Sequence, residues 1–131
     1  MADMQLTSQP NGLNSIFFDK NSVLKSAAYT VVANDDNGKI FYSTIDNMVY
    51  TLPSIADGQV YTFVNMAEDG MAKMSISPAA LDGIMYVTAT DDKDLINTKA
   101  TAKKGDTVTI FNVAGTAYWS VSYARGVFAK E

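Results

Sequence analysis

The chain has 131 residues, a formal net charge of −4, and neither cysteine nor histidine. This length fits one domain that buries roughly two-thirds of the surface exposed by its unfolded chain. The missing residue types exclude disulfides, thiolate metal sites and the histidine-based catalytic triads. The basic side chains are scattered through the chain and form no cluster, so the sequence predicts no nucleic-acid-binding surface.

Residues 1–27 are expected to form an N-terminal arm. Residues 1–15 are polar and contain turn-forming residues. Ile16, Phe17 and Phe18 follow as a short apolar group, which either tucks into the core as a strand or docks on another chain. The start has neither the basic n-region nor the apolar h-region of a signal peptide. No window of the sequence approaches the roughly 18 apolar residues of a membrane span. We therefore expect a protein made in the cytoplasm, with no membrane contact.

The remaining residues show the alternating apolar pattern of short strands. The pattern predicts antiparallel hairpins from strands 29–33 and 39–44, within 50–65, and from strands 106–112 and 117–124. Further strands are expected at 71–77 and 83–87. In the last strand, Trp119, Val121 and Tyr123 are expected to share one face.

The spacing of these strands, without helices between them, predicts an all-β fold. We expect residues 28–131 to form a single antiparallel β-sandwich that resembles a jelly roll. No internal repeat is apparent in the sequence. The residues expected to be mostly buried are Leu52, Phe63, Val64, Ile76, Val108, Ile110, Trp119 and Val121.

No residue pattern indicates catalysis, a cofactor or a metal. Without His and Cys, an enzyme would need paired carboxylates, a lysine, or a serine with a lysine. Asp82 and Asp106 are one conceivable pair, but any chain with fourteen acidic residues offers such pairs. The turn at 34–38 lacks the spaced ligands of a calcium loop, and the carboxylates near Asp91 are more typical of a solvated loop than of a cation site. We expect no enzyme and no cofactor.

Tyrosine and methionine, with seven residues each, are the unusual part of the composition. Both are over-used at protein interfaces, although most of them are expected to fill the core. An exposed group would mark a subunit contact or, as the second interpretation, a carbohydrate platform. The candidate contact residues are Tyr42, Tyr86, Tyr118 and Phe128, together with Ile16, Phe17 and Phe18 of the arm.

Three stretches of the chain resemble small structural proteins of tailed bacteriophages. They are TLPSIADGQVYTFVN (Thr51–Asn65), ISPAALDGI (Ile76–Ile84) and DDKDLINTKATAKKGDTVTIFNVAGTAYWSVSYARGVFAKE (Asp91–Glu131). Similar β-modules occur as capsid cement (decoration) proteins and within tail fibres. A single domain with a short arm and no shaft repeats looks more like a cement protein than a fibre.

This resemblance implies a protein of the virion, located on the capsid surface, whose partners are the major capsid protein and further copies of itself. It implies no catalytic residues, and it favours a homotrimer slightly over a homodimer. A phage tail fibre or a receptor- or carbohydrate-binding β-module remains the alternative.

Overall fold

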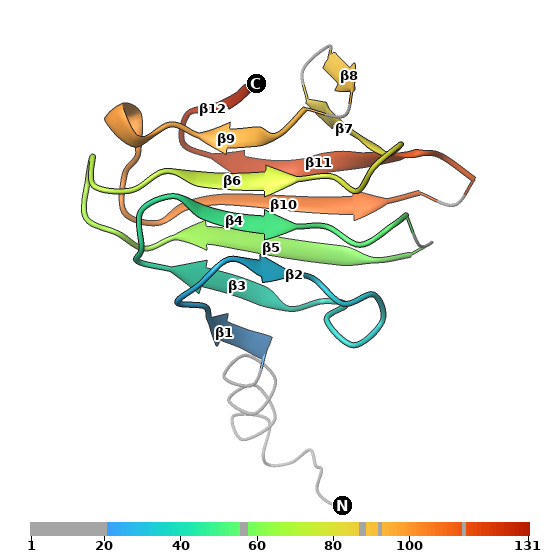
Figure 1. The fold of residues 1–131 in the computed structure, drawn as a ribbon, viewed down its shortest axis with the longest axis horizontal. Helices are drawn as coiled ribbons and strands as arrows, with labels where there is room; N and C mark the ends of the chain where they lie inside the picture. Colours follow the sequence, from blue (N-terminus) through green and yellow to red (C-terminus); the bar gives the residue numbers. More distant parts are fainter. Residues whose placement is uncertain (1–20, 56–57, 87–88, 92, 114) are drawn as a thin grey trace, which may run out of the picture.

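The computed structural model describes residues 21–55, 58–86, 89–91, 93–113 and 115–131 (Figure 1). They form two β-sheets around an apolar core, so the predicted all-β sandwich is confirmed. The strands are β1 (Ser22–Leu24), β2 (Tyr29–Thr30), β3 (Ile40–Ser43), β4 (Met48–Thr51), β5 (Val60–Asn65), β6 (Met74–Ser77), β7 (Gly83–Tyr86), β8 (Ala89–Asp91), β9 (Leu95–Asn97), β10 (Asp106–Asn112), β11 (Tyr118–Arg125) and β12 (Phe128–Lys130). A 3₁₀ turn, η1 (Lys99–Thr101), precedes β10.

Both sheets are mixed. The seven-stranded sheet has the order β1-β3-β5-β10-β11-β7-β8, and the five-stranded sheet has the order β12-β9-β6-β4-β2. The pairs β1/β3, β3/β5, β2/β4, β4/β6 and β7/β11 are parallel. The pairs β5/β10, β10/β11, β7/β8, β6/β9 and β9/β12 are antiparallel.

Strands β1 to β6 wind as a flattened coil. Successive strands alternate between the two sheets, so each turn of the coil adds one strand to each sheet and neighbours within a sheet run parallel (Figure 1). Equivalent strands lie roughly twenty residues apart, which is a spacing found in solenoid repeats. The identical dipeptides Tyr29-Thr30 and Tyr50-Thr51 show this spacing directly, because they pair in register.

The predicted hairpins at 29–44 and 50–65 are wrong. In both cases the two strands belong to different sheets and do not pair with each other. Tyr50 and Phe63 meet across the core, with ring centroids 4.8 Å apart, because each strand points its apolar residues at the opposite sheet. The antiparallel arrangement is thus wrong for this half of the sandwich, and the jelly-roll connectivity is not confirmed.

The last predicted hairpin, β10 with β11, is confirmed but contains a β-bulge. Thr109 pairs with Tyr123 and Ile110 pairs with Val121, which leaves Ser122 as the extra residue of β11. Beyond the bulge the alternation changes phase, so Tyr123 is 54% exposed while Trp119 is fully buried. The expectation that Trp119 and Tyr123 share a face is therefore wrong.

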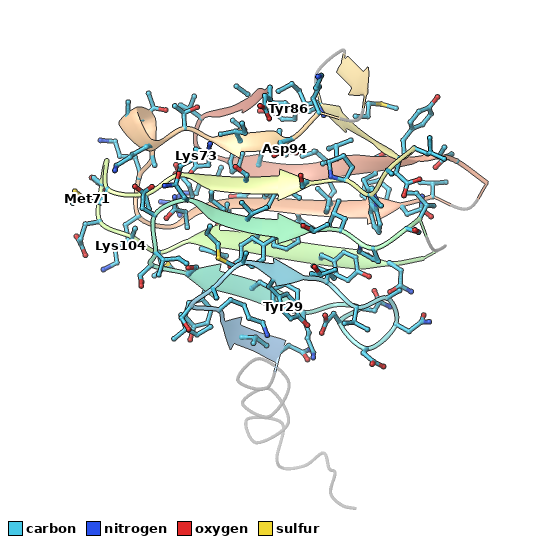
Figure 2. The ribbon with its side chains drawn as sticks, viewed as in Figure 1. Tyr29, Met71, Lys73, Tyr86, Asp94 and Lys104 are labelled. Carbon is cyan, nitrogen blue, oxygen red and sulfur yellow. The ribbon has the colours of Figure 1, made fainter. Side chains whose placement is uncertain are left out.

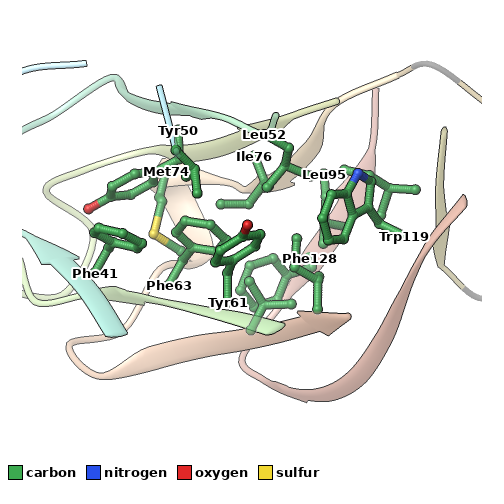
Figure 3. Packing of buried hydrophobic residues seen from close by; sticks show 14 of the residues in the cluster. Phe41, Tyr50, Leu52, Tyr61, Phe63, Met74, Ile76, Leu95, Trp119 and Phe128 are labelled. Carbon is green, nitrogen blue, oxygen red and sulfur yellow. The ribbon is translucent and has the colours of Figure 1, made fainter. Parts of the chain in front are cut away.

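The core lies between the sheets and is rich in aromatic rings (Figure 3). Phe41 lies 5.7 Å from Phe63, and Tyr61 lies 5.6 Å from Trp119, measured between ring centroids. The predicted core residues that are buried are Leu52, Phe63, Ile76, Val108, Ile110 and Trp119. Val64 and Val121 are only partly buried, and Val64 points to the outside of its sheet.

Strand β1 lies within the stretch that the sequence assigns to the arm. It pairs with β3 from Ser22 to Leu24, and the Lys25 N–H donates to the carbonyl of Tyr42 at 2.9 Å. The seven-stranded sheet therefore already includes residues that precede residue 28.

Candidate interaction surfaces

The outward side of the seven-stranded sheet is a continuous face, called the outer face below. In β10, buried residues that point into the core alternate with partly buried residues that point outward. The residues of neighbouring strands that pair with these outward residues lie on the same side of the sheet. The outer face consists of Ser22, Leu24, Ile40, Tyr42, Val60, Thr62, Val64, Met85, Thr107, Thr109, Phe111, Tyr118, Ser120, Tyr123 and Arg125.

The outer face is depleted of charge. Of the residues just named, Arg125 is the one with a charged side chain, whereas Asp, Glu, Lys and Arg together make up 18% of the sequence. Its most exposed apolar and aromatic side chains are 39% to 55% exposed, and they are Leu24, Val60, Met85, Tyr118 and Tyr123. Tyr, Met, Phe and Arg are the types enriched at the centre of protein interfaces, where other charges are depleted. The outer face thus has the composition of a binding surface.

Most charged side chains of the described residues lie in the loops at the two ends of the sandwich. One end, called the lysine-rich end, consists of the connections 25–28, 44–47, 66–73, 98–105 and 126–127. Lys99 pairs with Asp46 at 2.7 Å, Lys104 with Glu68 at 3.0 Å and Lys103 with Asp69 at 3.8 Å. Met71, Lys73 and Lys104 mark this end at the left of Figure 2. Cations outnumber carboxylates there, and the exposed ion pairs contribute little to stability.

The opposite end, called the acidic end, consists of the connections 31–39, 52–55, 58–59, 78–82, 113 and 115–117. Asp36, which is 3% exposed, holds the connection 31–39 of this end in place. Its carboxylate accepts hydrogen bonds from the Tyr29 hydroxyl at 2.7 Å, the Val32 N–H at 2.8 Å and the Lys39 ammonium at 3.0 Å.

These contacts shift the pKa values of both partners in the Tyr29–Asp36 pair. Burial by itself raises the pKa of Asp36, but the hydrogen bonds from Val32, Tyr29 and Lys39 outweigh it and hold the pKa below its ordinary value. Burial and the bond to Asp36 raise the pKa of Tyr29 to about 12. Asp36 is therefore ionised at neutral pH and holds the loop in place, which is a structural role.

A buried polar chain ties the two sheets together at the lysine-rich end. The Asn65 side-chain amide donates to the Asn97 Oδ1 at 2.8 Å, and the Asn97 amide donates to the Asp106 Oδ2 at 3.0 Å. Asp106 also accepts from the Lys103 N–H at 2.9 Å, and Asn97 donates to the Val127 carbonyl at 3.0 Å. Each group has protein partners, so this chain fixes loops and offers no open site.

The structure does not bring Asp82 and Asp106 together. Asp82 lies at the acidic end, where its Oδ2 accepts the Ile55 N–H at 3.0 Å, whereas Asp106 lies at the other end of the sandwich. Within the described residues there is no group of three or more acidic side chains that could hold a metal ion. Nor does that part of the chain contain a helix long and apolar enough to cross a membrane.

The predicted contact residues differ in their exposure. Tyr118 is 42% exposed and Tyr42 is partly buried, and both lie on the outer face. Tyr86 packs against the core, and Phe128 is 8% exposed, so the expected exposure of Phe128 is wrong. Phe128 is buried because β12 pairs with β9 and closes the edge of the five-stranded sheet. Ile16, Phe17 and Phe18 lie outside the described residues.

Sequence reasoning missed several exposed residues. The alternation places Tyr123 on the same face as Trp119, because the bulge at Ser122 has no sequence signal such as glycine. Val60 and Met85 belong to the outer face, and for Val60 the two-sided apolar pattern of β5 could have indicated this. Leu81, 96% exposed in a turn, has no sequence signal at all.

No family model matches this sequence, and no curated protein matches it.

Proposed function

We propose that this protein is a bacteriophage capsid cement (decoration) protein. It binds the outer surface of the major capsid protein lattice and stabilises the head, without catalysis. The observation that carries the proposal is the charge-depleted outer face, with its exposed Tyr, Met and Leu side chains. The resemblance of three stretches to phage structural proteins supplies the class of partner.

The size of the outer face supports this role. Strands of three to eight residues, with about 3.3 Å per residue and about 4.8 Å between strands, cover roughly 550 Å² before the relief of the side chains is added. This is of the same order as the roughly 800 Å² per partner of a standard protein interface. A rigid sheet also pays little conformational entropy on binding, which suits a protein that must hold neighbouring shell subunits in fixed positions.

The protein acts as a homo-oligomer in this proposal, with a trimer slightly favoured over a dimer. It is made in the host cytoplasm and reaches the surface of the capsid after the shell has formed. Copies placed across subunit boundaries strengthen the lattice through the sum of many contacts.

The test is binding of the purified protein to mature empty capsids of its phage, measured by co-sedimentation. The variants Tyr123→Asp and Val60→Asp place a charge on the outer face and are expected to weaken binding at least about tenfold, because a buried unpaired charge is costly. Thr30→Asp, on the exposed side of the five-stranded sheet, is the matched control and should bind normally. A wild-type protein that does not bind capsids would overturn the proposal.

One observation favours the alternative of a carbohydrate-binding tail-fibre module. Tyr118 and Tyr123 present exposed rings from the same strand on one side of the sheet, and exposed aromatic side chains can stack on sugar rings. A glycan array separates the two functions. Glycan binding that Tyr118→Ala and Tyr123→Ala abolish, together with no affinity for capsids, would establish the alternative in place of the cement function.

A further inference from the structure

Leu81, in the connection between β6 and β7, combines two features that are unfavourable in an isolated protein. Its φ angle is 74°, in the left-handed region that residues other than Gly and Asn rarely adopt. Its side chain is 96% exposed, so no packing within the chain compensates for this conformation. The other described non-glycine residues with positive φ are Asn34 and Asn47, and asparagine tolerates this region.

The surrounding contacts force this conformation on Leu81. The Asp82 N–H donates to the carbonyl of Ala79 at 3.0 Å, which closes a β-turn with Leu81 at its third position. The Asp82 carboxylate anchors the turn to the Ile55 N–H, and the Gly83 N–H donates to the carbonyl of Ala117 at 3.3 Å. The turn is therefore held rigidly with a leucine at its tip, where glycine would be the unstrained residue.

The turn with Leu81 at its tip lies at the acidic end. Val113, 50% exposed, belongs to the neighbouring connection between β10 and β11. Among the side chains of its described connections, Asp35, Asp36 and Asp82 outnumber Lys39. Beside this end, where β9 begins and β12 ends, Lys93 and Lys130 are equalled in number by Asp94 and Glu131. The end that carries this apolar tip thus has a net negative charge.

The lysine-rich end has the complementary features. Met71 is 61% exposed and Val127 is 54% exposed, so apolar side chains lie open there as well. Lys73 and Lys104 belong to the same end as Met71 (Figure 2), and cations exceed carboxylates over the whole end. Methionine adapts its shape to an incoming side chain more easily than other apolar residues.

We propose that two copies of this chain associate head to tail, with Leu81 of one copy packed against Met71 and Val127 of the next. The opposite charges of the two ends favour this orientation, whereas contact between two acidic ends would bring like charges together. Such a contact uses two different surfaces on each copy, so it closes into a ring or continues as a filament. The homotrimer that the resemblance to cement proteins slightly favours would be a ring of this kind.

The first test compares variants of the full chain by sedimentation equilibrium. Leu81→Gly removes the knob and relieves the backbone, so we expect a dissociation constant raised at least about tenfold, with an unchanged or higher melting temperature. Leu81→Met keeps a large apolar side chain and should associate like the wild type. Ala80→Gly places a glycine in the same turn without touching the knob, and should also associate normally. A Leu81→Gly protein that associates as the wild type does would overturn the proposal.

The second test distinguishes two different surfaces from a single self-complementary one. Met71→Asp disables the lysine-rich end, and Leu81→Gly disables the acidic end, so neither variant self-associates. Mixed together, they retain one intact pair of surfaces and should form a one-to-one heterodimer and nothing larger. Absence of this heterodimer would contradict head-to-tail contact.

Neither measurement involves capsids. A failure of the head-to-tail contact therefore leaves capsid binding by the outer face untouched. Conversely, a protein that does not bind capsids could still pass both tests.

Discussion

At the scale of single residues, Asp36 and Tyr50 show two opposite ways of burying a polar group. Asp36 has three hydrogen-bond donors around its carboxylate, and its pKa lies below the ordinary value as a result. The hydroxyl of Tyr50, in contrast, is fully buried and has no hydrogen-bond partner among the described residues, and burial raises its pKa. Asp36 thus stabilises the fold through the hydrogen bonds of its carboxylate. Tyr50 stabilises the fold through the burial of its ring, and its unpaired hydroxyl opposes this effect.

Asp36 predicts a specific pH dependence of stability. A carboxylate whose pKa is lower in the folded than in the unfolded state stabilises the fold above its unfolded pKa, near 4, and this contribution is lost as the pH falls through the folded pKa. We expect Asp36→Asn to lower the free energy of unfolding by about 1–3 kcal/mol at pH 7. The difference from the wild type should shrink in urea titrations repeated down to acidic pH, and Asp35→Asn, at an exposed position, should show little effect. A difference that stays constant with pH would contradict this role.

Tyr50 and Tyr61 allow a matched comparison of one hydroxyl group. Tyr50→Phe removes a buried hydroxyl without a partner and should raise the free energy of unfolding by about 0.5–2 kcal/mol. Tyr61→Phe removes a hydroxyl that donates to the Gln59 Oε1 at 3.1 Å, and should lower it by about 1 kcal/mol. Thermal and urea unfolding of the two variants measure both signs. Destabilisation by both substitutions would show that the Tyr50 hydroxyl has a partner after all.

At the scale of strands, the sequence predicts which residues are buried far better than which strands pair. The alternation in β4 and β5 identifies Tyr50, Leu52, Tyr61 and Phe63 as one apolar set, and all four are buried. The same alternation is compatible with two strands in one sheet or with two strands that face each other, because both arrangements bury every second residue. The repeated Tyr-Thr dipeptide of β2 and β4 was the available sign of the coil.

The pairing of the strands predicts the order in which they open. β5 and β10 each have a partner on both sides, whereas β1 and β2 are short strands at the edges of their sheets. We expect hydrogen exchange to protect the amides of β5 and β10 most strongly. The amides of Lys25 and Val31, which bond to Tyr42 and Thr51, should exchange earlier. Equal protection of edge and central strands would indicate that the sandwich opens only as a whole.

At the scale of the whole molecule, the spacing of the predicted strands, without helices between them, indicated the all-β class. The candidate surfaces were harder to foresee. Tyr118 lies on the outer face as an exposed residue, but Phe128 is buried by pairing between β9 and β12, which no local pattern encodes. Leu81 owes its exposure to a turn conformation fixed by Asp82 and Ile55, residues far apart in sequence.

The arm gives a prediction that separates folding from binding. Deleting residues 2–18 leaves β1 and its pairing with β3 in place, so the melting temperature should change by no more than about 3 °C. Loss of Ile16, Phe17 and Phe18 should weaken capsid binding or self-association, since these apolar residues are the part of the arm suited to docking. Calorimetry and co-sedimentation test the two effects separately. A truncated protein that does not fold would place these three residues in the core instead.

The flattened coil of β1 to β6 has a consequence for how this fold can change in size. Each turn contributes one strand to each sheet, and neighbouring turns meet through parallel pairing that no bulge interrupts. Duplication of one turn, roughly twenty residues, would widen both layers by one strand and leave the lysine-rich and acidic ends unchanged in kind. Internal gene duplication could therefore enlarge this part of the fold with loops of the existing kind. The antiparallel half from β9 to β12 could gain a strand only with a new type of connecting loop.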